Sequence, residues 1–516
     1  MFYHVFDVNI NRKGGGLFMN FLGIDLGTSS VKIIIMNQSG KIVQSISKSY
    51  NVSYPKANWA EQNPEDWWNS TKEGIKELLD TGNVKKEDIN GVSFSGQMHG
   101  LVLLDAKDEV LMPAILWCDQ RTQKQCDYLN NEFDQKKLSK YTGNKALTGF
   151  TLPKVLWVKE NKPEIYIKIA HMMLPKDYIS FKLTGVFDSD ATDASGTLMF
   201  DVENRKWSKE MLNLLELDEV VLPKVYESWQ IIGKVSENAS KETGLSMKTS
   251  VIAGAGDQAA GAVGTGTVDT GILSVALGTS GVVFACNEKF SVDKQNRLHS
   301  FCHSNGKWHQ MGVMLSAASC LQWWVKNINA DVQGDVFEKL LQEAEKAPVG
   351  SNNLLFLPYL MGERTPHDDP NARGSFIGLS ITNKRADMTR AILEGVCFGL
   401  RDSLEILKDL NVETKEVRVS GGGSESKLWR QILADVFNLN VNVTNSKEGP
   451  AYGAAILASV GCGLYNSVDD ACKHLIKITE TTLPIKENVE KYNKLYKIYA
   501  SLYSCLKEKF KEISEL

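Results

Sequence analysis

One carboxylate, Asp257, lies within a run of glycine and alanine, AGAGDQAAGAVGTG, at residues 253–266. An unpaired carboxylate is costly to bury, and its neighbours here are too small to cover it. Glycine also lets a backbone approach a ligand closely. The pattern therefore indicates an acid/base or metal-binding carboxylate in a cleft. The alternative is a tight loop in which Asp257 caps a helix that begins at Gln258.

A Gly-Thr-Ser turn occurs twice, half a chain apart. LGTSS at residues 26–30 and LGTSG at residues 277–281 each stand between two apolar, strand-like segments. Each pattern predicts a β-hairpin, and the N–H groups and hydroxyls of such a turn can form an anion-binding concavity. The repetition predicts two halves of similar design that face each other across a cleft. The residues expected to contact phosphate are Thr28, Ser29, Gly278 and Thr279.

Two further features are typical of a nucleotide site. Asp25 ends the first predicted strand, where it can hold Mg²⁺ through water, because Mg²⁺ keeps most of its hydration shell; the alternative is a turn aspartate bonded to its own backbone. Gly421, Gly422 and Gly423 follow a strand and precede a helix. Such glycines let a nucleotide lie against the backbone with its phosphates at the helix N-terminus. The alternative is a flexible connector, and the motif is neither G-x-G-x-x-G nor a Walker A loop.

A histidine in a glycine-flanked turn indicates a polar pocket. His99 lies in GQMHG, residues 96–100, at the end of a predicted strand. A histidine buried in the core is the alternative. His299, His303 and His309 are spaced somewhat like metal ligands, but no Cys or carboxylate set with metal-site spacing accompanies them, so a zinc site is not favoured.

The elements that must position these residues alternate between strands and helices. In the first half the order is β-β-β-α-β-α, which predicts a sheet flanked by helices and the α/β class. Residues 163–185 are expected to be helical, with Pro175 opening the last helix, and residues 189–197, SDATDASGT, are expected to form a hydroxyl- and Asp-rich loop. In the second half, hairpins are predicted at 272–286 and 297–314. Over the whole chain, helices are predicted at 64–82, 387–407, 428–437, 449–460 and 489–516. Further strands are predicted at 41–49, 91–95, 101–104, 417–420 and 439–443.

Length and composition limit the class of protein. The 516 residues are enough for two domains with full cores. The net charge of −4 gives no reason to expect a nucleic acid or an anionic membrane as partner. Nine cysteines without a C-x-x-C pair are typical of reduced thiols in a cytoplasmic protein. Residues 1–19 are interpreted as a disordered extension, with Met19 as an alternative start, and no transmembrane helix is expected.

Taken together, the motifs resemble the FGGY carbohydrate kinase family over about residues 20 to 470. The resemblance implies two actin-like, ribonuclease H-like ATPase domains flanking a deep catalytic cleft, with ATP and Mg²⁺ as cofactors. It also implies a sugar-binding domain at 20–265, an ATP-binding domain at 266–480 and a C-terminal helix at 481–516. The motifs that carry it include GIDLGTSSVK (23–32), SGQMHGLVLLD (95–105), AGAGDQAAGAVG (253–264), SVALGTSGV (274–282), HSFCH (299–303), FLPYLMGERTPHDDPNARG (356–374) and SGGGSESKLWRQILADV (420–436).

The resemblance also implies roles for individual residues. Asp257 would act as catalytic base and, with Met98, His99 and Gln258, would contact the sugar. The two Gly-Thr-Ser turns would grip phosphates, and the triple glycine would lie beside the nucleotide. An ordinary aspartate, with a pKa of ~3.9, is a weak base for an alcohol, but the proton moves late in the reaction.

The GQMHG and GERTPH stretches point to D-xylulose, phosphorylated on its 5-hydroxyl, rather than to glycerol or gluconate. One departure keeps ribulose, gluconate and glycerol open as alternatives: Gln258 stands where Asn is frequent in xylulose-phosphorylating members. An actin- or Hsp70-like ATPase without a sugar acceptor is the alternative from another class, but it would lack HSFCH and GERTPH. A homodimer is a further expectation.

Overall fold

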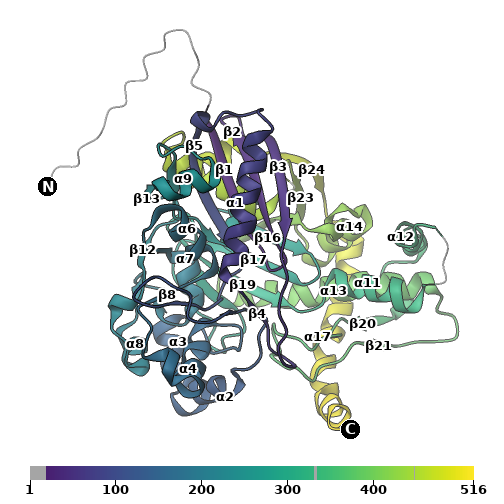
Figure 1. Ribbon diagram of the computed structural model, residues 1–516. Coiled ribbons are helices and arrows are strands. Elements are labelled where there is room, and N and C mark those ends of the chain that lie inside the picture. The colour runs from purple at the N-terminus through teal and green to yellow at the C-terminus, as the bar shows by residue number, and fades with distance from the viewer. Residues whose placement is uncertain (1–18, 331–333, 447) are drawn as a thin grey trace.

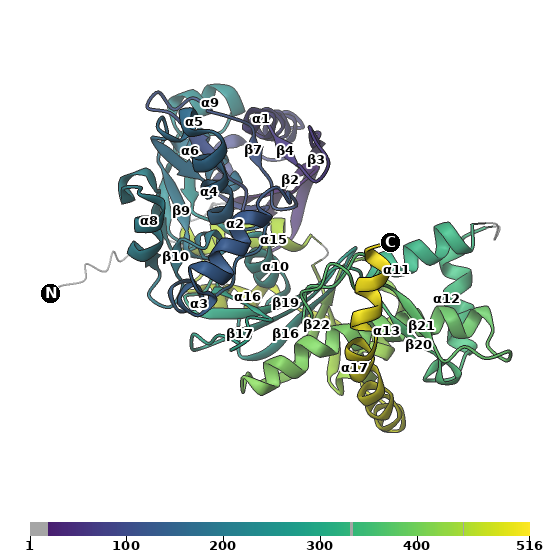
Figure 2. The same cartoon turned by 90° about the horizontal axis from the view of Figure 1, so that it is seen from below.

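The two predicted Gly-Thr-Ser hairpins each lie at the centre of a seven-stranded sheet in the computed structural model, which describes residues 19–330, 334–446 and 448–516. The two sheets form separate lobes (Figures 1 and 2). The predicted N-terminal extension lies outside the described residues, except for Met19. The first sheet runs in the order β13 (Ile231–Lys234), β14 (Ser250–Ile252), β5 (Ile89–Gly96), β1 (Asn20–Leu26), β2 (Ser30–Asn37) and β3 (Ile42–Ser49), with β15 (Ala255–Gly256) also paired to β5. The second runs in the order β18 (His299–Cys302), β19 (Trp308–Met314), β17 (Gly281–Asn287), β16 (Gly271–Leu277), β22 (Thr414–Ser420), β23 (Asn440–Thr444) and β24 (Ile478–Thr482).

The two sheets repeat one topology. In the first, β1 pairs antiparallel with β2 on one side and parallel with β5 on the other. In the second, β16 pairs antiparallel with β17 and parallel with β22. The turns at 27–29 and 278–280 therefore occupy equivalent positions at the end of each central strand. The predicted duplication and the α/β class are confirmed.

Helices α10 (Asp257–Thr265) and α15 (Gly449–Gly461) cross in close contact between the lobes (Figure 2). A Cβ atom on Gly453 would lie only 1.8 Å from the carbonyl oxygen of Ala260, so glycine is required at this crossing. Helix α15 also packs against β1 and β5. A segment near the end of the chain thus covers the first sheet and ties the lobes together. The domain boundary at 265/266 stays a prediction.

A few of the remaining helices pack against the sheets, and the others pack mainly against neighbouring helices. Helix α1 begins where the sequence predicts, because the Asn63 side chain accepts a hydrogen bond from the backbone N–H of Glu65. Within the described residues, no helix combines the length and the apolar character needed to cross a membrane. In the first lobe they are α1 (Pro64–Asp80), α2 (Gln123–Asp127), α3 (Gln135–Thr142), α4 (Thr151–Asn161), α8 (Lys209–Leu215) and α9 (Glu237–Thr243). In the second half of the chain they are α11 (Ala318–Trp323), α12 (Val336–Lys346), α13 (Arg385–Asp409), α14 (Lys427–Phe437), α16 (Val468–Leu475) and α17 (Lys486–Ser514).

Two local predictions are wrong. Residues 163–185 are not continuously helical, because β8 (His171–Met173) separates α5 (Pro163–Tyr166) from α6 (Pro175–Thr184) and pairs with β6 (Val102–Leu104). Residues 189–197 are not a loop either. They end a strand, form the short helix α7 (Ala191–Ala194) and a 3₁₀ turn, and are buried throughout. The side chains of Asp190, Thr192, Ser195 and Thr197 make hydrogen bonds inside the protein, which polar composition alone does not reveal.

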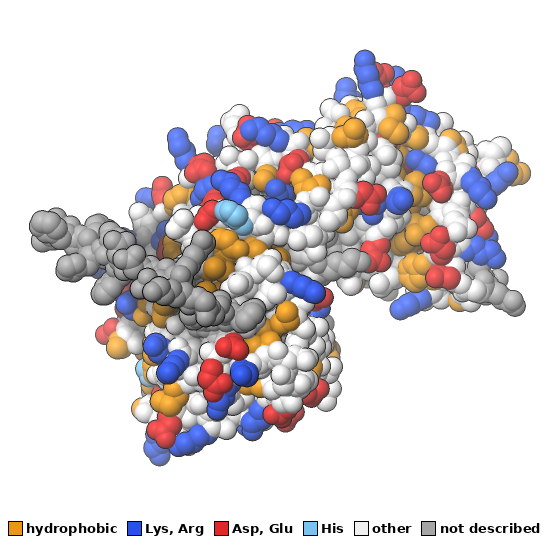
Figure 3. Space-filling view, turned by 90° about the horizontal axis from the view of Figure 1, so that it is seen from above, with side chains coloured by type: hydrophobic (Ala, Val, Ile, Leu, Met, Phe, Trp, Pro, Cys, Tyr) orange, Lys and Arg blue, Asp and Glu red, His pale blue; other side chains and the backbone are white. Residues whose placement is uncertain are grey.

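The surface carries charges of both signs. On the face shown in Figure 3, basic and acidic side chains are intermixed over both lobes. This distribution agrees with the small net charge of −4 and gives that face no single-sign area of the kind that attracts a polyanion.

Candidate active site

A cavity of about 260 Å³ is lined by strands of the second sheet and by connecting segments and the start of α10 from the first half of the chain. It brings together Met98, His99, Asp257 and Gln258, the four residues that the sequence predicts to contact the sugar. A pocket of this size, with apolar walls and a few converging polar groups, is typical of a small-molecule site. The lining also includes Trp117 and Phe150 from the first lobe and Ser280, His299 and Arg364 from the second.

Asp257 is the first residue of α10, with Gly256 as N-cap, and its side chain is partly exposed in the cavity. Burial and the negative charge of Asp25 raise the pKa of Asp257 to about 7. Hydrogen bonds from Gln258 favour the carboxylate and only partly offset this rise. The carboxylate is therefore a stronger base than an ordinary aspartate. A pKa near neutrality suits a group that must accept a proton from an alcohol.

Asp25 lies at the end of β1, beside the turn at 27–29. Burial raises its pKa more than the Ser95 hydroxyl and the Lys32 ammonium lower it. No cluster of three or more His, Cys, Asp or Glu that could hold a metal occurs in residues 19–330, 334–446 and 448–516. The neighbouring carboxylates of Asp25 and Asp257 nevertheless fit Mg²⁺ that arrives with a nucleotide, because Mg²⁺ needs only one or two protein carboxylates beside phosphate oxygens and water.

His99 is held in an unusual backbone conformation, with φ 69°. Its ring Nδ1 lies 2.7 Å from the carbonyl oxygen of Gly196, and a Cβ at Gly196 would lie 2.5 Å from the ring. Its own carbonyl accepts hydrogen bonds from Lys154 Nζ at 2.8 Å and from the Thr151 hydroxyl at 3.1 Å. Burial lowers the pKa of His99 to about 3, so the ring is neutral. The strained backbone and these contacts fix one orientation of the imidazole.

The two Gly-Thr-Ser turns lie at different places relative to the cavity. In the first, the Thr28 hydroxyl accepts a hydrogen bond of 3.0 Å from Trp117 Nε1, and Trp117 lines the cavity. Ser29 is exposed and its carbonyl accepts from the backbone of Tyr50. In the second, Ser280 itself lines the cavity, whereas the first turn is joined to the cavity wall through Trp117.

A second cavity, of about 740 Å³, lies on the other side of the second turn. Gly278 and Thr279 line it together with Gly422 and Gly423. Gly421 is not among the lining residues: its φ of 82° and the contact of 2.7 Å that a Cβ would make with the Leu277 carbonyl show that glycine is needed there for packing. The turn at 278–280 thus borders both cavities.

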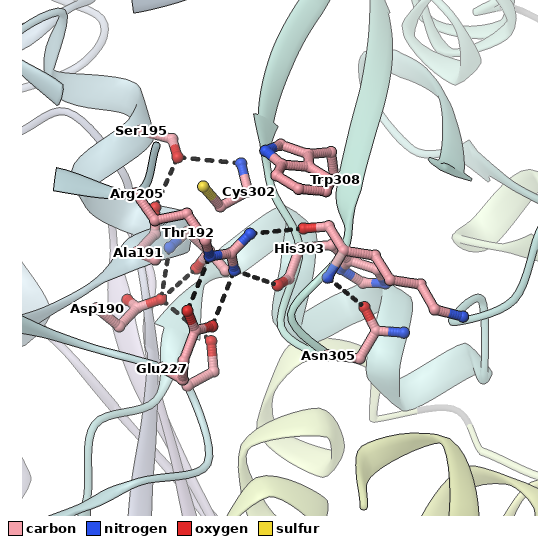
Figure 4. A network of polar contacts seen from close by, with 12 residues as sticks. Asp190, Ala191, Thr192, Ser195, Arg205, Glu227, Cys302, His303, Asn305 and Trp308 are labelled. Atoms are coloured by element: carbon pink, nitrogen blue, oxygen red, sulfur yellow. Dashed lines mark hydrogen bonds and ion pairs between the residues drawn. The ribbon is translucent and has the colours of Figure 1, made fainter. Parts of the chain in front are cut away.

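A buried network fixes the start of α10. The backbone N–H of Gly256 donates to the Thr192 hydroxyl at 2.9 Å. The Thr192 hydroxyl in turn donates to Asp190 Oδ2 at 2.6 Å (Figure 4). Asp190 Oδ1 lies 3.0 Å from Lys176 Nζ, which also pairs with Asp177 at 2.6 Å. Gly256, the residue before Asp257, is therefore held by a fully buried chain of charged and polar side chains. Sequence patterns indicated no function for Thr192, Asp190, Lys176 or Asp177.

The same region joins the two lobes. The Arg205 guanidinium makes two hydrogen bonds of 2.8 Å to Glu227 and donates to the backbone carbonyls of His303 and Lys307, at the turn between β18 and β19 (Figure 4). Close by, the backbone N–H of Cys302 donates to the Ser195 hydroxyl at 3.0 Å. These bonds fix the hairpin that carries His299 relative to the first lobe.

The sequence analysis assigned no role to four residues that line the first cavity: Trp117, Phe150, His299 and Arg364. Two of them lie in motifs that were singled out, His299 in HSFCH and Arg364 in GERTPH. Nothing in either motif indicates that it lies beside Asp257, which is far away in the chain. The polar residues of both motifs are visible in the sequence, but only the fold shows that they share one cavity.

The fold is that of an actin-like kinase. It has two sheets of the same topology, a carboxylate between the two lobes and a second cavity lined by glycines. The chain belongs to the FGGY family of carbohydrate kinases: residues 20–264 match the family's N-terminal domain and residues 273–462 its C-terminal domain.

Relatives of known name are similar over almost the whole chain. Xylulose kinase of Bacillus subtilis is 41% identical over 488 residues, which cover 94% of this chain and 97% of that protein. Among solved structures, a xylulose kinase from Brucella ovis has a TM-score of 0.88 at 36% identity, covering 95% of this chain and 99% of that one. A gluconate kinase from Lactobacillus acidophilus has a TM-score of 0.91 at 27% identity, covering 96% and 100%.

Proposed function

We propose that this carbohydrate kinase transfers the γ-phosphoryl group of ATP to the 5-hydroxyl of D-xylulose. The observation that carries the proposal is the position of the turn at 278–280, which borders the cavity of Asp257 on one side and the glycine-lined cavity on the other. A nucleotide in the larger cavity would have its terminal phosphate at this turn, next to a sugar in the smaller one. The identity to xylulose kinases, 41% and 36%, supports the choice of sugar.

In this mechanism Asp257 accepts the proton of the 5-hydroxyl as the oxygen attacks phosphorus in line. Met98, His99 and Gln258 hold the sugar, and the N–H groups and hydroxyls of the turns with Thr28, Ser29, Gly278 and Thr279 orient the phosphates. Gly422 and Gly423 would lie along the nucleotide, with Gly421 supporting the turn. Mg²⁺, held through water by Asp25 beside Asp257, would neutralise charge on the phosphoryl oxygens when bound.

The alternative is another sugar of the same family. Fold similarity does not separate the sugars, since structures named gluconate kinase and xylulose kinase from Lactobacillus acidophilus match this chain equally well. A panel of D-xylulose, D-ribulose, D-gluconate and glycerol, measured by ADP release with ATP, separates the candidates. We expect the highest kcat/KM with D-xylulose and little ADP release without sugar. Equal ATP hydrolysis with and without every sugar would instead favour an actin-like ATPase.

The pH dependence of the reaction should report Asp257. Only its carboxylate form accepts a proton, and its pKa is about 7. Activity is therefore expected to fall as the pH decreases below that value, with kcat/KM for D-xylulose rising through pH 6 to about 8 and then levelling off. A profile measured at fixed ionic strength that stays flat down to about pH 5 would contradict the raised pKa.

Two further expectations belong to the proposal. All nine cysteines are free thiols, most of them buried, which is in keeping with a reducing, cytoplasmic location. The homodimer, and the absence of nucleic acid and membrane partners, stay predictions for which sedimentation and binding assays are the tests.

A further inference from the structure

A guanidinium without a partner lies in the wall of the sugar cavity. Arg364 comes from the segment between β20 (Leu355–Leu357) and β21 (Ser375–Ile377) and lines the cavity with His99 and His299. Its backbone N–H bonds to Glu363, but its side chain makes no hydrogen bond or ion pair with any residue in the described parts of the chain. Burial lowers the pKa of Arg364, which reflects the cost of desolvating this charge. A desolvated guanidinium with free N–H groups is suited to an oxygen that only accepts hydrogen bonds.

His99 offers a hydrogen-bond acceptor to the same cavity, whereas Arg364 offers donors. Its Nδ1 must donate, because the carbonyl oxygen of Gly196 at 2.7 Å can only accept. In a neutral imidazole the other nitrogen, Nε2, is then an acceptor. Nε2 has no hydrogen bond to any described residue. The positive charge of Arg364 adds to burial in keeping both His99 and His299 neutral.

Arg364 also makes no ion pair with Asp257, the carboxylate that lines the same cavity. The cavity therefore offers a proton-accepting carboxylate, a neutral imidazole acceptor and a guanidinium donor as separate contacts. A ligand that satisfies all three has a hydroxyl for Asp257, another hydroxyl for His99 and an acceptor-only oxygen for Arg364. A hydroxyl opposite Arg364 would accept a bond too, but its own proton would still need an acceptor, which a guanidinium lacks.

We propose that Arg364 and His99 together recognise an α-hydroxycarbonyl group: Arg364 donates to the carbonyl or carboxylate oxygen, and His99 Nε2 accepts from the adjacent hydroxyl. The inference rests on the proposed function in placing the sugar in this cavity, and it deepens it by naming the substrate class. The site selects ketoses over the polyols obtained by reducing them. It also binds aldonates, in which a carboxylate supplies the acceptor oxygens.

The test is calorimetric binding of three five-carbon ligands: D-xylulose, its reduction product xylitol, and D-xylonate. The wild-type protein should bind D-xylulose and D-xylonate about 10- to 100-fold more tightly than xylitol, as expected for a hydrogen bond to a charged donor. R364M should lose about tenfold or more for the two carbonyl ligands and little for xylitol. R364K keeps the charge but not the planar fork, so its affinity for the two carbonyl ligands should lie between those of the wild type and R364M.

The matched control is R373M. Arg373 lies in the same segment, but its guanidinium donates to the backbone carbonyls of Pro370 and Ala372 and does not line the cavity, so all three affinities should stay unchanged. Equal wild-type affinity for D-xylulose and xylitol would overturn the inference without any variant, even if R364M does not fold. If D-xylulose is phosphorylated but not preferred over xylitol, the inference alone fails. If D-xylulose is not phosphorylated at all, the proposed function fails, and the ratio of D-xylonate to xylitol affinity still decides the role of Arg364.

Discussion

The variant Asp257→Asn is expected to lower kcat by about 10²–10⁴-fold, the usual contribution of general-base catalysis. Asparagine has nearly the same size and still accepts hydrogen bonds, but it cannot take the proton of the sugar hydroxyl. The Kd of D-xylulose should therefore change little, because its contacts with Met98, His99 and Gln258 remain. Single-turnover rates and calorimetric Kd values on the same preparation separate the two effects.

A second readout comes from the pH profile. Since the pKa of about 7 belongs to Asp257, the residual activity of the variant should lose its dependence on pH in that range. Asp269→Asn is the matched control, because Asp269 follows α10 closely in the chain but pairs with Lys307 at 3.3 Å and does not line either cavity. Near-normal turnover in the Asp257 variant would refute the assignment of the base.

The variant Lys176→Met is expected to lower the free energy of unfolding far more than Lys182→Met, a substitution on the same helix. Lys176 is 1% exposed and lies among Asp177, Asp190 and Asp193, each 0% exposed, at distances of 2.6, 3.0 and 3.9 Å. Removing the cation leaves three buried carboxylates without compensation, and breaking a buried ion pair in this way costs about 3–5 kcal/mol. Chemical denaturation should detect the loss as a lower free energy of unfolding.

The loss should depend on pH in a defined direction. Burial already raises the pKa of Asp177 and of Asp193, and removing Lys176 would raise them further. A carboxyl whose pKa is higher in the folded state stabilises the protein at low pH and loses that contribution as the pH rises. The deficit of the variant should thus be larger at pH 8 than at pH 5.

Lys182→Met provides the control for this experiment. Lys182 lies on the same helix, α6, but its ion pair with Glu65 is at the surface, where the side chains are 26% and 43% exposed. Such pairs are worth about 0–1 kcal/mol. If both variants lose the same stability, or if the Lys176 deficit does not vary with pH, the buried cluster has no special role in the fold.

The sequence by itself determined the features that rest on short-range patterns. The repeated Gly-Thr-Ser turns between apolar segments predict two hairpins, because short apolar, strand-like segments on both sides of a glycine turn leave few other local structures. The run of small residues around Asp257 identifies its carboxylate as a group that must meet a ligand or solvent. The N-cap at Asn63 likewise follows from local hydrogen bonding.

Other features depend on contacts between residues far apart in the chain, and only the tertiary structure decided them. Residues 189–197 are buried in the core, where Lys176, which is distant in the sequence, pairs with Asp190 and Asp193. The pKa of Asp257 is raised by its burial and by the charge of Asp25, at the other end of the first lobe's sequence. Arg364 and His99 share a cavity only because the two lobes meet there. Charges and hydrogen bonds act over a few ångströms in space, and sequence patterns record only neighbours along the chain.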